Sequence, residues 1–148
     1  MPQLAFMKHK RLIINYDFDF KLLGLISSAK SYKLAWSFNQ ALALELNKDQ
    51  DLELEFGNNV KIKIGNYIYQ TENSTYRLLQ NKAVESNHSE AKFLLPDQPH
   101  LDYLLQIEGE TYPFSMEMII EKLKSLNTVE YIAVIDIEKL KTKENLLF

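Results

Sequence analysis

The chain of 148 residues contains no cysteine. This absence excludes disulfide bridges, thiolate nucleophiles and zinc sites with sulfur ligands. Because a reducing compartment suits a chain of this kind, we expect a cytoplasmic protein. At this length a single domain, residues 1–148, buries roughly two thirds of the surface that its unfolded form exposes, so its core needs no disulfide support.

Glycine is also scarce: the chain has four, and none is spaced as in a phosphate-binding loop. We therefore expect no nucleotide cofactor, and no other cofactor is indicated. Ser27 and Ser28 lack the following glycine of a nucleophile elbow, and the three histidines lack a paired motif. The sequence contains no recognisable catalytic residue and leans against an enzyme.

Long apolar runs and a strong excess of positive charge are missing too. No stretch of about 18 apolar residues runs without charge, so we expect no membrane span. The first residues lack a cleavage site after a proper hydrophobic region and do not resemble a signal peptide. Seventeen basic against twenty acidic residues give a pI near 5.6, so nucleic acid is an unlikely partner.

Alternation of apolar and polar residues predicts strands at 11–26, 67–70 and 76–80. The clearest pattern is at 52–64, where two alternating segments flank Gly57-Asn58-Asn59. A three-residue loop pairs Phe56 with Val60 and places each glutamate opposite a lysine, so we predict a hairpin in that register. A two-residue loop would mix the faces.

Later segments continue the strand pattern. Residues 92–95 and 101–107 are expected strands, and the polar stretch 85–90 is the expected flexible loop. Residues 129–137 are apolar on both faces, which predicts a strand in the interior of the sheet. A polar tail follows at 138–148.

The first helix is predicted at 32–46, with Ser27 and Ser28 as capping hydroxyls. Its far side is apolar as well as its near side, so the helix is either deeply buried, which we favour, or covered by a second subunit. The residues of this candidate interface are Trp36, Ala43 and Leu44.

A second helix is predicted after Ser115, which suits an N-cap, with Phe114 packing against Ile119. Together these elements predict an α+β fold: one domain in which a mainly antiparallel sheet of five to seven strands packs against two helices around one core.

Residues 95–103 read Leu-Pro-Asp-Gln-Pro-His-Leu-Asp-Tyr. With residues 18–28, 32–36 and 140–148, this segment resembles the bacterial IPExxxVDY family. Three positions match the signature and three carry related side chains. The matches are Pro96, Asp102 and Tyr103, and the replacements are Leu95 for Ile, Asp97 for Glu and Leu101 for Val. The resemblance implies a small bacterial protein and transfers no catalytic or binding role to these residues.

The same segment contains a candidate site. Asp97, His100 and Asp102 lie within six residues, and carboxylates with an imidazole can bind a divalent ion or relay a proton. The favoured reading is structural: Pro96 ends a strand, Asp97 bonds turn amides, Asp102 satisfies nearby backbone and Tyr103 packs inward. The metal, if any, is unknown from the sequence.

Three functions remain open from the sequence. The first is a non-catalytic protein-interaction or regulatory module, which binds an unknown protein partner or a second copy. The alternative is a metal- or small-ligand-binding protein, or an enzyme, that uses Asp97, His100 and Asp102. The third is binding of single-stranded RNA on a sheet that carries Tyr67, Tyr69 and Tyr76.

Overall fold

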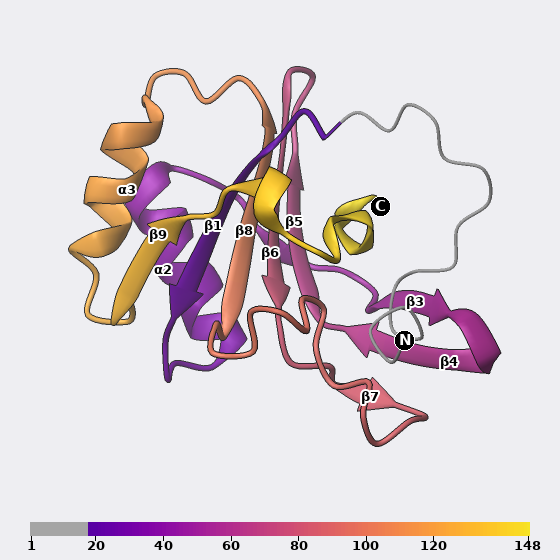
Figure 1. Cartoon of the computed structure of the whole chain (residues 1–148). Coiled ribbons are helices and arrows are strands. Elements are labelled where there is room, and N and C mark those ends of the chain that lie inside the picture. Colours follow the sequence, from indigo (N-terminus) through magenta and orange to yellow (C-terminus); the bar gives the residue numbers. More distant parts are fainter. Residues whose placement is uncertain (1–17) are drawn as a thin grey trace.

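A computed structural model describes residues 18–148, and that part of the chain contains two α-helices and nine strands (Figure 1). The helices are α2 (Ser31–Leu42) and α3 (Met116–Lys124). The strands are β1 (Lys21–Ile26), β2 (Asn47–Lys48), β3 (Leu52–Phe56), β4 (Val60–Ile64), β5 (Asn66–Gln70), β6 (Ser74–Gln80), β7 (Glu85–Ser86), β8 (Tyr103–Gly109) and β9 (Tyr131–Val134). Three 3₁₀ turns are described as well: η1 (Gly57–Asn59), η2 (Ile137–Lys139) and η3 (Lys143–Leu146).

All strand pairs among the described residues are antiparallel, and they form two sheets. The larger sheet has six strands in the order β2-β5-β6-β8-β1-β9, and the smaller has three in the order β3-β4-β7. The predicted α+β class, with a mainly antiparallel sheet and two helices, is confirmed. The separate small sheet is not predicted by the sequence pattern. Residues 11–17 of the strand expected at 11–26 lie outside the described residues.

The hairpin β3–β4 has the predicted register, in which Phe56 pairs with Val60 and Leu52 with Ile64. Its three-residue connection places Asn58 and Asn59 at φ 65° and 60°, a left-handed conformation that asparagine tolerates better than most residues. The matched apolar pairs on one face and charged pairs on the other therefore determined the register.

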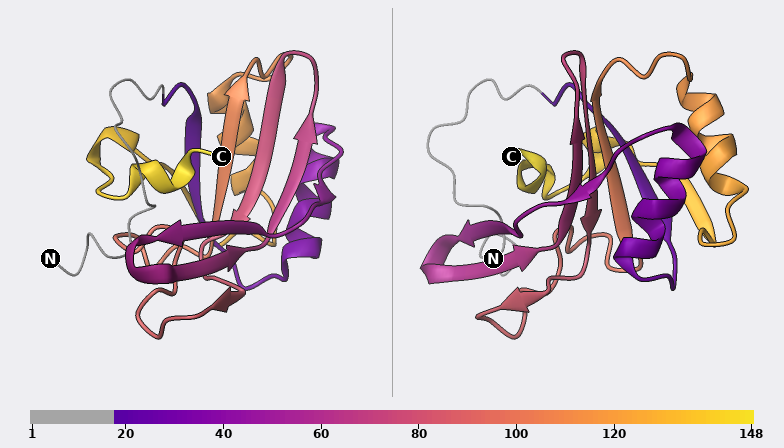
Figure 2. Two further views of the ribbon diagram at one scale, coloured as in Figure 1. Left: turned by 90° about the vertical axis from the view of Figure 1, so that its right-hand side faces the viewer. Right: turned by 180° about the vertical axis from the view of Figure 1, so that it is seen from behind.

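Two hydrophobic cores lie on opposite faces of the six-stranded sheet, where the sequence suggests one. Leu23 and Leu25 point to the core under α2 and α3, and Leu22 points to the other core. Figure 2 shows the helices on one face and the small sheet with the C-terminal turns on the other. Successive side chains of a strand alternate between faces, so each central strand contributes to both cores.

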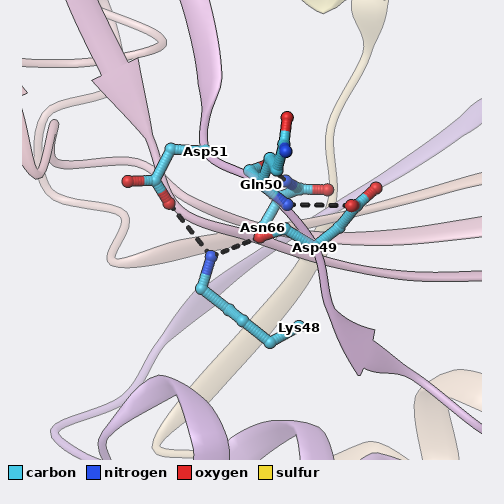
Figure 3. Close-up of polar contacts among 5 residues, drawn as sticks. All are labelled: Lys48, Asp49, Gln50, Asp51 and Asn66. Atoms are coloured by element: carbon cyan, nitrogen blue, oxygen red, sulfur yellow. Dashed lines mark hydrogen bonds and ion pairs between the residues drawn. The ribbon is translucent and has the colours of Figure 1, made fainter.

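The chain passes from the large sheet to the small one between β2 and β3, and it returns between β4 and β5. Asn66 joins the two crossings: its side chain donates to Gln50 O at 2.6 Å, and its carbonyl accepts from Asp49 N–H at 3.2 Å. Figure 3 shows Lys48 reaching across the same turn to Asp51, at 3.0 Å. The buried Asn66 therefore fixes how the two sheets are connected.

The tail at 138–148 is polar in sequence but packs into the second core. Leu140 and Leu146 are buried there. Asn145 is fully buried and donates to Leu94 O at 2.8 Å, and Gln106 of β8 donates to Leu146 O at 2.9 Å. Polar side chains here satisfy buried backbone groups, so polarity does not mean exposure.

Several predicted boundaries are wrong. Residues 92–95 make only an isolated bridge, Phe93 with Lys82, in place of a strand. The residues expected at 129–137 form a shorter strand, β9, which lies at the sheet edge and not in its interior. Side chains of this segment meet both cores. Ile132 packs against the helix-side core, and Ile135, just after the end of β9, packs against the other core. Odd- and even-numbered positions are therefore both apolar in the sequence.

The helix ends differ in how well the sequence predicts them. Ser115 caps α3 as predicted, accepting from Met118 N–H at 3.2 Å. Helix α2 begins after Lys30, which makes no side-chain cap, and the predicted cap Ser27 instead donates to Thr128 O. Neither helix in the described part has the length and hydrophobicity that a membrane crossing needs.

Gly109 and Gly57 give a test of the backbone geometry. Gly109 has φ +83°, and a Cβ there would lie 2.0 Å from the carbonyl oxygen of Asn73. We expect Gly109→Ala to lower the free energy of unfolding by about 2 kcal/mol or more, because left-handed strain alone costs about 1–3 kcal/mol.

The matched control is Gly57→Ala, since no atom beyond its chain neighbours lies within 4 Å of its Cβ position. We expect a change within about 0.5 kcal/mol. Urea denaturation measures both variants. Equal losses at the two positions would show that the close contact at Gly109 is absent.

Candidate functional site

The signature loop, residues 94–102, is organised around Asn81, which directly follows β6 and is fully buried. Its side-chain amide donates to Gln98 O at 2.8 Å and Leu101 O at 2.9 Å, and its oxygen accepts from Leu95 N–H at 2.9 Å. Leu94 N–H donates to the Asn81 carbonyl at 2.7 Å. One side chain therefore replaces the sheet partner that this loop lacks.

The two carboxylates of the signature loop bond different parts of the chain. Asp97 accepts from Thr142 Oγ1 at 2.8 Å and from Lys141 N–H at 3.1 Å, which attaches the C-terminal segment. Asp102 Oδ2 accepts from Ser27 N–H at 2.9 Å, after the end of β1. Both carboxylates therefore cap backbone or hydroxyl donors of distant segments.

Tyr103, at the start of β8, is buried on the helix side of the sheet. Its hydroxyl donates to Ala29 O at 2.7 Å. Burial raises the pKa of Tyr103 above the ordinary value, and the nearby charges of Asp102 and Tyr67 add to the effect. This side chain links β8 to the segment that leads into α2.

Asp97, His100 and Asp102 do not form a metal site in the structure. Within residues 18–148, no three His, Asp or Glu side chains are placed to hold an ion. His100 is exposed, and Pro96 is half-buried after the buried Leu95. Asn81, which organises the loop, is not found by sequence reasoning, because nothing local marks an asparagine after a strand as buried.

The candidate interface on α2 divides in the structure. Trp36 is 65% exposed and Tyr32, one turn earlier, is 56% exposed, so the burial favoured from the sequence is wrong for Trp36. Ala43 is exposed in the left-handed conformation that ends the helix. Leu44 is buried in the helix-side core.

The tyrosines considered for RNA binding lie on the face that the helices cover. Tyr67 and Tyr69 are half-buried against the helix-side core, and Tyr76 belongs to it. Tyr69 and Tyr76 stack with ring centroids 6.2 Å apart and an interplanar angle of 28°. They do not form an open stacking platform, and RNA binding stays an untested hypothesis.

Two surface features remain as candidate sites. One is the edge strand β9, where Val134 is 60% and Tyr131 51% exposed. The other is a cleft of about 350 Å³ at the C-terminal end of α2, between the β5–β6 turn and the connection from β8 to α3. Tyr76 and Ala43 are among the residues that line it.

Comparison of the chain with protein-family models, curated proteins and solved structures gave no match. The comparisons therefore neither support nor exclude the resemblance of residues 95–103 to the IPExxxVDY signature.

The role of Asn81 can be tested by replacement with alanine. We expect Asn81→Ala to lower the free energy of unfolding by about 3 kcal/mol or more, because each buried backbone group left unpaired costs about 1–3 kcal/mol. His100→Ala, an exposed change in the same loop, should stay within about 0.5 kcal/mol. Guanidinium denaturation gives both values, and comparable losses would contradict the arrangement around Asn81.

The burial of the Tyr103 phenol predicts a pH dependence of stability. A raised pKa in the folded state means that the native protein keeps the proton longer than the unfolded chain. The contribution of the Tyr103 phenol to the free energy of unfolding is therefore complete below pH about 10. It falls as the pH rises from there through the folded-state pKa of Tyr103. We expect the stability difference between the wild type and Tyr103→Phe to stay constant from neutral pH to that point and shrink above it. An unchanged difference at high pH, measured by urea denaturation, would contradict this assignment.

Proposed function

We propose that this protein is a non-catalytic interaction module that binds an extended segment of a partner protein along β9. The observation that carries the proposal is that β9 is an apolar edge strand without a second neighbour among the described residues. Strand addition to a free edge is a common mode of peptide recognition, in which backbone hydrogen bonds supply affinity.

The two edge strands of the large sheet differ in polarity: β2 is polar and β9 is apolar. Binding of a partner strand requires one edge that is not protected against pairing. The β2 edge consists of Asn47 and Lys48, which are both exposed and polar. Short strands and lysines are the usual protection of an edge against unwanted pairing. The sequence of β9 is Tyr-Ile-Ala-Val, without charge or proline, so this edge has only its shortness to protect it.

The backbone groups available on β9 follow from its pairing with β1. Ile135 N–H donates to Leu22 O at 2.9 Å, so Ile135 faces β1. Hydrogen-bonding direction alternates along an antiparallel strand, so Ala133 also faces β1, whereas the N–H and C=O groups of Ile132 and Val134 face outward. A bound strand would use these outward groups.

The acidic residues that flank β9 favour a segment of another protein, and not β9 of a second copy, as the bound strand. Glu130 and Asp136 flank β9, both are exposed, and neither forms an ion pair with a described residue. In a symmetric dimer, the β9 strands of two copies would pair antiparallel, with Ile132 of each copy opposite Val134 of the other. This register places Glu130 of each copy opposite Asp136 of the other. Like charges directly opposite are destabilising, so the favoured occupant is an apolar segment with a basic residue at each end.

Further features of the sequence and the structure accompany this proposal. Residues 95–103 support membership of the bacterial IPExxxVDY family, and the absence of cysteine supports a cytoplasmic location. The exposed aromatic pair on α2, Tyr32 and Trp36, is in keeping with an interaction protein. Nothing in the geometry of Asp97, His100 and Asp102 favours the metal, ligand or enzyme alternative.

A designed peptide tests the function. The probe is fluorescein-labelled Lys-Val-Thr-Val-Thr-Val-Thr-Lys with blocked ends, titrated with the protein and followed by fluorescence anisotropy. We expect saturable binding, and at least tenfold weaker binding of the same peptide with Glu at both ends. High salt should narrow this difference because exposed charges are screened.

Variants of Val134 provide the control. Val134→Pro removes an N–H that β1 does not use, and Val134→Lys protects the edge, so both should abolish peptide binding while the protein still melts cooperatively. Val134→Thr keeps the branched side chain and should bind within about twofold of the wild type. Peptide binding that survives both Pro and Lys would rule out β9 as the site. Self-association that Val134→Lys abolishes would identify a second copy as the occupant.

A further inference from the structure

We infer that the cleft at the C-terminal end of α2 binds an organic cation, an ammonium group with an apolar body. This site is separate from β9 and goes beyond the interaction function. The cleft has a volume of about 350 Å³, which is within the range of small-molecule sites. Its walls come from three parts of the chain: the end of α2, the β5–β6 hairpin, and the connection between β8 and α3.

Aromatic rings form one wall of the cleft. Tyr69 and Tyr76, cross-strand neighbours on β5 and β6, line it as a stacked pair. Tyr112 also lines it and is 92% exposed, so its ring is available to a ligand. An ammonium within about 6 Å of the centroid of such a ring is attracted by the ring's negative face.

The Tyr76 hydroxyl gives this wall a polar atom without a hydrogen-bond partner among residues 18–148. The residue is 5% exposed, and its hydroxyl makes no hydrogen bond to any residue in 18–148. Tyr76 lines the cleft, and we assign a ligand in the cleft as the partner of its hydroxyl. Burial, and to a smaller extent Tyr69, raises the pKa of Tyr76, so the group stays a neutral phenol that can accept a hydrogen bond.

The electrostatics of the cleft favour positive charge. Glu110 is the one charged residue among those that line it, and no described cation forms an ion pair with this carboxylate. Leu42 and Ala43 bring the C-terminal end of α2 to the cleft. A helix carries partial negative charge at that end, and α2 has no basic residue in its last turn to offset it.

One ammonium of the protein already lies against an aromatic ring that borders the cleft. Lys122 Nζ is 5.0 Å from the ring centroid of Phe114, which lines the cleft, whereas Lys122 itself does not. An anionic ligand would meet Glu110 and the helix end without a lining cation. A neutral ligand would gain the apolar contacts of Leu42 and Phe114 but not the electrostatic ones. The combination of rings, a carboxylate and a helix C-terminus therefore selects a cation.

The test compares choline with its neutral analogue 3,3-dimethylbutan-1-ol, in which carbon replaces the charged nitrogen. Both are titrated into the full chain and followed by amide chemical-shift changes in two-dimensional NMR. We expect saturable shifts with choline that centre on residues 69–76 and 109–114, and at least tenfold weaker binding of the alcohol.

Two charge-removing variants complete the test. Glu110→Gln should weaken choline binding at least fivefold. Glu72→Gln, in the β5–β6 turn but not itself a lining residue, should leave choline binding within about twofold of the wild type. Tyr69→Leu removes one aromatic ring from the cleft wall and should also weaken choline binding relative to the wild type. Three results would each overturn the inference: no saturable shifts with choline, equal binding of the alcohol, or equal effects of the two glutamine variants. None of them bears on β9, so the two sites are tested independently.

Discussion

The structure depends on the burial of the central strands β6, β8 and β1 on both faces. Leu78 and Leu79 of β6 are neighbours in sequence but belong to the two different cores. Apolar burial contributes about 25 cal/mol per Å² removed from water, so a sheet covered on both faces gains from successive residues of its middle strands. The helices supply one cover, and the small sheet with the signature loop and the C-terminal turns supplies the other.

The second cover contains little regular structure, and buried carboxamides hold it in place. Asn66, Asn81, Gln106 and Asn145 are buried, and each bonds a backbone carbonyl of a loop or terminal segment. Loops inside a protein carry backbone groups that must find partners. Asparagine and glutamine suit this role because each offers a donor and an acceptor without charge. The residues of the signature loop therefore have a structural explanation in this fold.

Both candidate binding features lie where the two covers end. The outer side of β9 has no neighbouring strand among the described residues, and the cleft opens at the C-terminal end of α2. Function in this protein is thus expected at the margins of the sheet, because its faces are occupied by the two cores. The signature loop is instead part of the cover, with its two aspartates bound to donors of distant segments.

Local sequence alone determined the elements whose signals are local. The β3–β4 register followed from matched neighbours, and the start of α3 followed from Ser115 as its cap. Only the tertiary structure decided that β9 lies at an edge, that Leu140 and Leu146 of the polar tail are buried and that Trp36 is exposed. An apolar pattern reports that a segment meets apolar surface, but not which segment supplies it. That choice depends on contacts between residues far apart in the chain, and those exist only after folding.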